Sequence, residues 1–108
     1  MIRHLVLFRL ADGSAAERAE QTAGMRDRLE ALPALLSGVL SLRVGPDVVG
    51  GAEHWDVALC ADFTDRDALQ RYQVHPEHRA AVEWMASFVA ARSIVDLELT
   101  DPGQDQPR

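Results

Sequence analysis

One short stretch of the sequence, residues 72–78, gathers side chains that can exchange protons. It holds the phenol of Tyr72 and the imidazoles of His75 and His78, with Pro76 between the two histidines. A neutral imidazole is the commonest general base in proteins, and a phenol can donate a hydrogen bond to a carbonyl or an enolate. The stretch therefore predicts proton transfer by Tyr72 and His78, in which His75 has a supporting role.

Pro76 indicates how the chain must run through this stretch. Proline disrupts the interior of a helix but suits its first position, so we expect a break at residues 74–75 and a new helix over 76–91. His78 would lie one turn from the start of the second helix, four residues before Val82 on its inward apolar stripe. The helix dipole and burial both disfavour the imidazolium ion there, so we expect a lowered pKa for His78 and a neutral ring.

Structural alternatives stay open for each of these side chains. Tyr72 and His75 can cap the junction between two helices, and His78 can satisfy a buried carbonyl group. His4, near the start of the chain, can be a strand-end histidine bonded to backbone. His75 and His78 also have the spacing of two metal ligands, but two ligands without a third make a poor site, so no metal is expected.

The hydrophobic pattern predicts the elements that must position these residues. The expected strands cover residues 2–10, 39–44, 54–63 and 92–100, and the expected helices run from a capping box at Ser14 and Glu17 to about Pro33, from 64 to 72 and from 76 to 91. The polar residues 101–108 are predicted to form a disordered tail. The order β-α-β-β-α-β predicts a ferredoxin-like α+β fold, an antiparallel sheet with helices on one face.

Strand alternation places further side chains on the sheet face that the helices should cover. His4 lies there on the first strand and can donate a second hydrogen bond, and Asp96 on the last strand can fix the tautomer of a histidine ring. We expect a pocket for a small apolar or aromatic molecule between this face and the helices. Its predicted lining consists of Val6, Phe8, Val57, Leu59, Val82, Met85, Phe88 and Ile94.

The opposite face of the sheet carries apolar side chains that no helix can cover. They are Leu5, Leu7, Val95, Leu97 and Leu99. An exposed apolar surface of this kind predicts a partner, and a second copy of the chain is the simplest one. We therefore expect a homodimer in which two sheets pack face to face.

The bulk composition of the 108 residues argues against several classes of function. The net charge of −6 disfavours binding to nucleic acid or to an anionic membrane surface. The sequence has no apolar run long enough to span a membrane, no apolar signal segment at its start and a single cysteine, Cys60, so we expect a soluble cytoplasmic protein. Gly50-Gly51 lies in a loop without a lysine, so no phosphate-binding loop is expected there. No cofactor is expected either.

Three parts of the sequence resemble one known family. They are the opening residues 1–8 (MIRHLVLF), the strand end Asp62-Phe63, and Tyr72 followed by the segment 75–78 (HPEH). This pattern resembles the stress-responsive A/B barrel (Dabb) family, and the likeness covers residues 1–100. The resemblance implies one Dabb domain over 1–100, whose two sheets in a ferredoxin-like homodimer form an α/β barrel. It implies no single activity, and it leaves open a hard cation near aspartate and backbone oxygens.

One branch of this family consists of polyketide cyclases, which close a ring by an intramolecular aldol reaction. The resemblance matches their catalytic tyrosine and histidine with Tyr72 and His78, and it matches two further pocket residues with His4 and Asp96. The cyclases carry another histidine where this sequence has Val57. The expected function is therefore a small-molecule-binding Dabb protein. The alternatives are a cofactor-free cyclase, isomerase or monooxygenase that uses Tyr72 and His78, and a dimeric interaction module.

Overall fold

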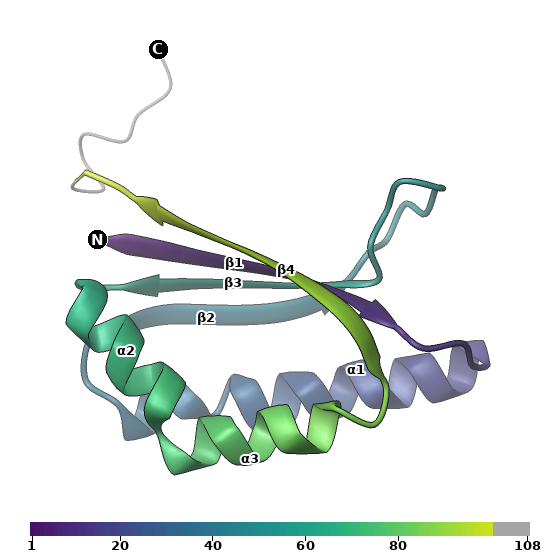
Figure 1. Cartoon of the computed structure of the whole chain (residues 1–108), viewed down its shortest axis with the longest axis horizontal. Coiled ribbons are helices and arrows are strands. Elements are labelled where there is room, and N and C mark those ends of the chain that lie inside the picture. Colours follow the sequence, from purple (N-terminus) through teal and green to yellow (C-terminus); the bar gives the residue numbers. More distant parts are fainter. Residues whose placement is uncertain (101–108) are drawn as a thin grey trace.

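Four antiparallel strands lie over three α-helices in the computed structural model of the chain (Figure 1). The structure describes residues 1–100, and the tail predicted for residues 101–108 lies outside the described residues. The elements in chain order are β1 (Ile2–Leu10), α1 (Ala15–Leu29), a 3₁₀ helix (Leu32–Leu35), β2 (Val39–Pro46), β3 (Val57–Phe63), α2 (Arg66–Val74), α3 (Pro76–Met85) and β4 (Val89–Glu98). No helix within residues 1–100 is long and apolar enough to cross a membrane.

The strand order β2-β3-β1-β4 confirms the ferredoxin-like α+β fold predicted from the sequence. Each neighbouring pair of strands is antiparallel, and the register places His4 of β1 between Ala61 of β3 and Asp96 of β4. Side chains that are directly opposite one another in such a ladder share a face of the sheet. His4 and Asp96 are therefore neighbours on one face, with Val6 and Ile94 beside them in the next matching positions.

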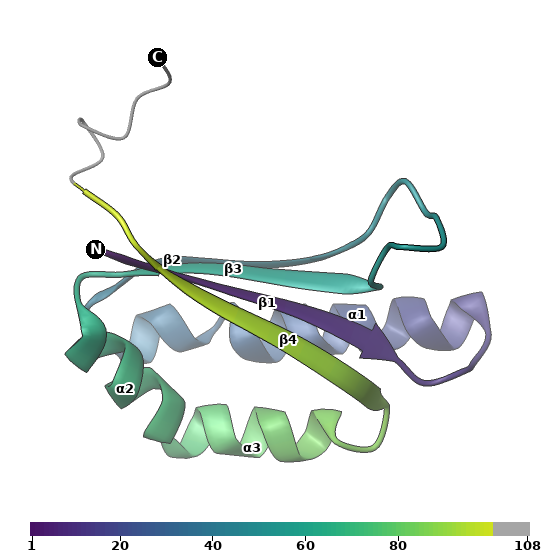
Figure 2. The ribbon, with the colours of Figure 1, turned by 45° about the horizontal axis from the view of Figure 1, so that its top comes forward.

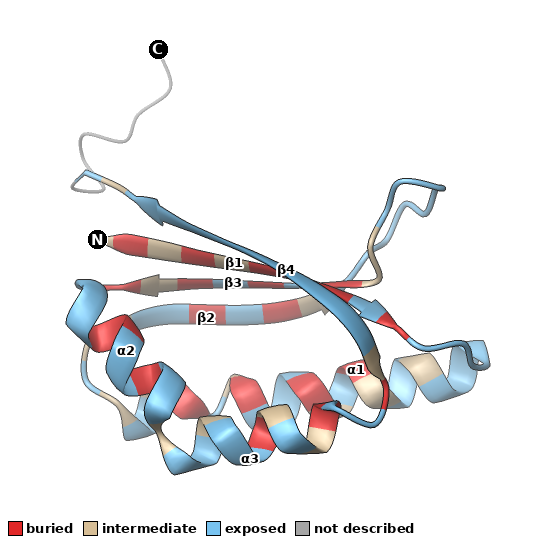
Figure 3. Ribbon diagram, viewed as in Figure 1, coloured by how far each residue is buried: buried red, intermediate tan, exposed pale blue. Residues whose placement is uncertain are grey.

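The helices all lie against one face of this sheet, and the opposite face is uncovered (Figure 2). The hydrophobic core fills the space between the two layers, where Phe63, Met25 and Leu29 are almost fully buried. Figure 3 shows that β4 is exposed along nearly its whole length, unlike the alternating burial of β1 and β3. The core is thus built mainly on three strands, and β4 forms an open edge.

Helix α1 begins with the predicted capping box. The backbone N–H of Glu17 donates to Ser14 Oγ at 3.1 Å, and the backbone N–H of Ser14 donates to Glu17 Oε1 at 3.3 Å. These two bonds satisfy amide groups that the first turn leaves without a partner. Pro33 lies beyond the end of α1, inside the 3₁₀ helix that returns the chain to the sheet.

The end of α3 and the start of β4 differ from the prediction. α3 ends at Met85 rather than near residue 91, and β4 begins at Val89 rather than at 92. Val89 pairs with Leu10 across the sheet, at a shift in register next to Arg9. Alanine at positions 90 and 91 favours a helix locally, but tertiary pairing overrides such propensities.

The third strand also begins later than the alternation of its sequence predicts. β3 starts at Val57 rather than at His54. The His54 ring is bonded through Nδ1 to Asp47 at 2.9 Å, and the Arg9 guanidinium lies 4.7 Å from the centre of the Trp55 ring. These contacts hold residues 54–55 in the connection between β2 and β3 rather than in the sheet.

Candidate functional site

A sharp corner between α2 and α3 brings two proton-exchanging side chains together. His75 forms this corner, because it is at once the C-cap of α2 and the N-cap of α3. Its ring Nδ1 accepts a hydrogen bond from the backbone N–H of Glu77 at 3.1 Å, and Pro76 occupies the first position of α3. A ring nitrogen that accepts a hydrogen bond carries no proton, so this contact selects neutral His75 with its proton on Nε2. The ring of His75 therefore stabilises the turn between α2 and α3.

Tyr72 lies at the end of α2 with its ring against that of His78. The ring centres are 4.4 Å apart, with the planes tilted by 53°. Tyr72 also contacts Phe63 edge-on at 5.1 Å and His4 edge-on at 6.3 Å. An aromatic cluster with these spacings fixes ring orientation through packing. The Tyr72 ring is thereby held between the two histidines.

The hydroxyl of Tyr72 is neutral and has no partner among the described residues. Only 1% of the residue is exposed to solvent, and burial raises the pKa of the Tyr72 hydroxyl well above its ordinary value. The side chain makes no hydrogen bond to any residue in the range 1–100, although it lines a cavity. A buried hydroxyl usually finds a partner, so this donor is available to a bound molecule.

The hydrogen bond of His78 fixes the state of its ring. Its Nδ1 lies 3.1 Å from the backbone carbonyl oxygen of Gln73. A carbonyl oxygen only accepts, so Nδ1 must carry the proton, and in the neutral ring Nε2 is left with a free lone pair. Burial lowers the pKa of His78, electrostatic interactions with His4, Arg92 and His75 lower it further, and the bond to Gln73 opposes the shift. The ring is thus a neutral base with its lone pair on Nε2.

A second histidine lies on the sheet side of the same cluster. His4 is 4% exposed, and its Nδ1 lies 2.5 Å from Oδ1 of Asp96 on the neighbouring strand. The carboxylate accepts a hydrogen bond from Nδ1–H, which orients the ring and places Nε2 on its other side. The pairing follows from the strand register, which sets the two residues directly opposite each other.

A cavity of about 230 Å³ lies beside these side chains, between the sheet and the helices. Its walls come from β1, β3 and β4 on one side and from α1, α2 and α3 on the other. The lining residues are His4, Val6, Phe8, Leu29, Leu59, Tyr72, Gln73, His78, Val82, Met85, Arg92 and Ile94. The cavity therefore combines an apolar wall with a few convergent polar groups, which is the usual composition of a small-molecule site.

Comparison with known proteins identifies the family. The family model described as the Stress Responsive A/B Barrel Domain (Dabb) matches residues 2–99. The chain belongs to the Dabb family. An uncharacterized protein of Streptomyces coelicolor is 37% identical to this Dabb protein over 101 residues, which are 91% of this chain and 99% of that relative. The family resemblance in the sequence is thus confirmed.

Two solved structures are similar to the Dabb protein along most of its length. A dimeric protein of unknown function with a ferredoxin-like fold from Bacteroides fragilis has a TM-score of 0.82 and 33% identity, covering 91% of this chain and 95% of that chain. A dimeric ferredoxin-like protein of unknown function from Thermobifida fusca has a TM-score of 0.76 and 35% identity, covering 91% of this chain and 90% of that chain. These relatives share the fold and are described as dimers, and neither has an assigned function.

Six of the eight predicted apolar lining residues border the cavity of the Dabb protein. The other two, Val57 and Phe88, lie outside its lining. Val57 is buried in the hydrophobic core at the first position of β3. Phe88 follows the end of α3 and packs edge-on against Trp84 at 5.0 Å. Asp96 contacts the site through His4 rather than through the cavity wall.

Three residues that line the cavity of the Dabb protein were missed in the sequence. Leu29 ends the buried stripe of α1, and Gln73 follows Tyr72 and also supplies the carbonyl that bonds His78. Arg92, on β4, lies opposite Phe8 of β1. The strand alternation that placed Ile94 and Asp96 on this face also places Arg92 there, because the three positions are two residues apart.

Metal-ligating side chains do not converge in the described part of the Dabb protein. Within residues 1–100, no group of three or more His, Cys, Asp or Glu side chains is arranged to hold a metal ion. His75 and His78 use their Nδ1 atoms on the backbone of Glu77 and Gln73.

Proposed function

We propose that this Dabb protein binds a small, largely apolar organic molecule in the cavity between its sheet and its helices. The observation that carries this proposal is an open cavity of about 230 Å³ in a protein of this size, bordered by apolar side chains and by an unpartnered Tyr72 hydroxyl. Apolar walls supply the affinity of such a site, and the few polar groups orient the ligand.

Binding can be tested by filling the cavity. Val82 lines it from α3, whereas Ala80 is exposed on the same helix. We expect 2-acetylnaphthalene to shift NMR signals of the lining residues in the wild type and in Ala80→Trp, and to lose most of its affinity for Val82→Trp. Equal affinity for all three proteins, or no binding to the wild type, would contradict the proposal.

A second, more specific function is cofactor-free proton transfer of the cyclase or isomerase type. It is favoured by the free lone pair on His78 Nε2 and the unpartnered hydroxyl of Tyr72, on rings 4.4 Å apart. In this mechanism His78 removes a proton from the carbon beside a carbonyl group, while Tyr72 donates a hydrogen bond to the carbonyl oxygen as it gains negative charge. The resulting enolate either attacks a second carbonyl within the molecule or takes the proton back at another carbon.

Proton transfer can be tested without knowing the natural substrate. We expect the wild type to speed up exchange of the methyl protons of 2-acetylnaphthalene for deuterium, followed by NMR in D₂O. His78→Gln should lower the rate of the catalysed exchange by about 10²–10⁴-fold, and Tyr72→Phe by about 10²–10³-fold. Arg79→Gln, an exposed change on the same helix, is the matched control. Equal rates in the four proteins would remove both residues from the mechanism and leave binding alone.

The homodimer is proposed to form through the uncovered face of the sheet. Leu7, Val95 and Leu97 on that face expose 41, 56 and 42% of their surface, which is unusual for a monomer. The relatives from Bacteroides fragilis and Thermobifida fusca are described as dimeric. Two copies packed face to face would bury these side chains and give the α/β barrel expected for the family. Residence in the cytoplasm stays a prediction.

A further inference from the structure

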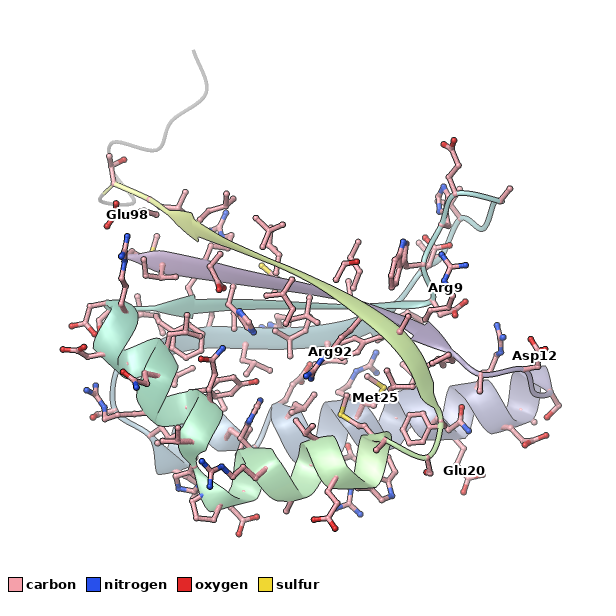
Figure 4. The ribbon with its side chains drawn as sticks, viewed as in Figure 1. Arg9, Asp12, Glu20, Met25, Arg92 and Glu98 are labelled. Atoms are coloured by element: carbon pink, nitrogen blue, oxygen red, sulfur yellow. The ribbon has the colours of Figure 1, made fainter. Side chains whose placement is uncertain are left out.

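Arg92 is the one charged side chain in the cavity lining that has no partner in the described part of the chain. It projects from β4 into the space between the sheet and the helices, as Figure 4 shows. It forms no hydrogen bond or ion pair with any residue in the range 1–100, and its positive charge disfavours protonation of the His78 ring. A guanidinium with five donors is thus left facing the cavity.

No carboxylate in the lining offsets this charge. The residues that border the cavity include neither aspartate nor glutamate. Asp96 lies on the same face of β4, but four residues along a strand are roughly 13 Å, and its Oδ1 is bonded to His4. In a protein with a net charge of −6, an exposed cation that borders an apolar wall without an acidic neighbour offers a place for an external anion.

A second cavity adjoins the first, and Arg92 borders both of them. This neighbouring cavity, of about 290 Å³, is lined by Arg92 and by residues 89–91 at the start of β4, and it shares Phe8, Val82 and Met85 with the first. A ligand that extends from one cavity into the other would pass beside the guanidinium. The apolar residues common to both cavities would hold its body.

We infer that Arg92 binds a carboxylate group of the ligand, so that the substrates of this pocket are small organic acids with an apolar or aromatic body. This inference rests on the proposed function and specifies its substrate class. The planar guanidinium matches a carboxylate through two parallel hydrogen bonds, and one guanidinium balances one negative charge. A phosphate dianion would need further cationic donors, and Arg92 is the one permanent cation in the lining. With the carboxylate held at Arg92, the rest of the ligand lies toward Tyr72 and His78.

The experiment compares an acid with its neutral isostere. The probes are 2-naphthoate and 2-naphthamide, which have the same shape and differ in charge. Affinities are measured by calorimetry at about pH 8, where the carboxylate is ionised and histidine rings are neutral. The proteins are the wild type, Arg92→Gln, Arg92→Lys and the control Arg79→Gln, which changes an exposed arginine of α3 outside the lining.

We expect the wild type and Arg79→Gln to bind naphthoate at least about tenfold more tightly than naphthamide, the size of one charge-assisted hydrogen bond. Arg92→Gln should lose this preference while keeping its affinity for naphthamide, and Arg92→Lys should retain part of it, because lysine keeps the charge without the planar fork. The unchanged amide affinity would show that Arg92→Gln has kept its fold and its cavity.

Two results would overturn the inference, and they differ from a failure of the proposed function. Equal affinity of the wild type for acid and amide would show that the cavity binds ligands without using Arg92 as an anion site. A preference for the acid that survives in Arg92→Gln would assign it to another group. Failure of both probes to bind the wild type would contradict the small-molecule pocket itself, and with it the assignment of Arg92.

Discussion

At the scale of single residues, His78 is the most informative side chain. Its Nδ1 donates a hydrogen bond to the carbonyl oxygen of Gln73. Burial is the largest cause of the lowered pKa of His78. We predict that the His78 ring titrates, by NMR, with a midpoint below the ordinary value of 6.5. Tyr72→Phe keeps the ring contact and should leave the midpoint low. A midpoint at or above 6.5 would contradict the buried, neutral state of the ring.

The same shift makes stability depend on pH. The unfolded chain binds a proton at His78 near pH 6.5, whereas the folded chain resists it, so the free energy of unfolding falls as the pH drops below 6.5 toward the folded midpoint. We predict that urea unfolding shows a smaller loss of stability between about pH 7.5 and 5 in His78→Gln than in the wild type. An identical loss in both proteins would show that His78 does not contribute to it.

Asp96 should matter more for the fold than its exposed position on β4 indicates. Its Oδ1 is the partner of His4 Nδ1, and His4 is 4% exposed. Asp96→Ala leaves that buried donor without a partner, so we predict a loss of about 1–3 kcal/mol in the free energy of unfolding by urea. Glu98→Ala changes the next residue on the same face and should alter stability by less than about 0.5 kcal/mol. Similar values for the two variants would argue against the His4–Asp96 bond.

At the scale of elements, α1 and α3 pack at a glycine. A Cβ atom added to Gly24 of α1 would lie 2.5 Å from the Trp84 ring of α3, which also packs against Arg28 and Phe88. At an open helix position, replacing glycine by alanine stabilises by about 0.5–1 kcal/mol. We predict the opposite sign for Gly24→Ala, a loss of roughly 1 kcal/mol or more, because the ring must move. In a Trp84→Ala background, Gly24→Ala should instead raise the free energy of unfolding, because the ring is no longer there. If Gly24→Ala stabilises the wild type, this packing is contradicted.

The element boundaries explain which parts of the site could be predicted. Tyr72, His78, His4 and Asp96 follow from local spacing and strand alternation, and the structure brings all four together. A helix extended to residue 91 would put Phe88 on the inward stripe, but α3 ends at Met85. The helix propensity of residues 86–91 does not show that the residues from Val89 onward pair with β1, which is distant in the sequence.

The remaining differences at the site have the same origin. Because β4 begins at Val89, Arg92 lies within the strand and faces the helices, rather than standing at the strand end. Because β3 begins at Val57, that residue borders the core at the strand end and not the cavity. Leu29 lines the cavity because of how α1 packs against the sheet. The periodicity of the sequence predicts that Leu29 is buried, but it does not predict how the helix is placed.

At the scale of the whole molecule, the proposed dimer depends on the uncovered sheet face. Leu97 lies on that face of β4, whereas Leu35 is 56% exposed on the 3₁₀ helix, which is not part of the sheet. We predict that the wild type sediments as a dimer at micromolar concentration and that Leu97→Glu sediments as a monomer, because each interface would bury two unpaired carboxylates. Leu35→Glu should remain a dimer. A monomeric wild type, or a dimeric Leu97→Glu, would contradict the proposed interface.

The corner at His75 also has a consequence for how this site can evolve. In one continuous helix, residues 72 and 78 would point roughly 120° apart around the axis, so their rings meet only because the chain turns between them. Point substitutions at Tyr72 or His78 could therefore install new chemistry while the turn stays intact. An insertion or deletion within 73–77 would rotate one ring away from the other and erase the site in a single step. We expect lineages of this protein to keep the number of residues between the two positions constant, even where the side chains themselves differ.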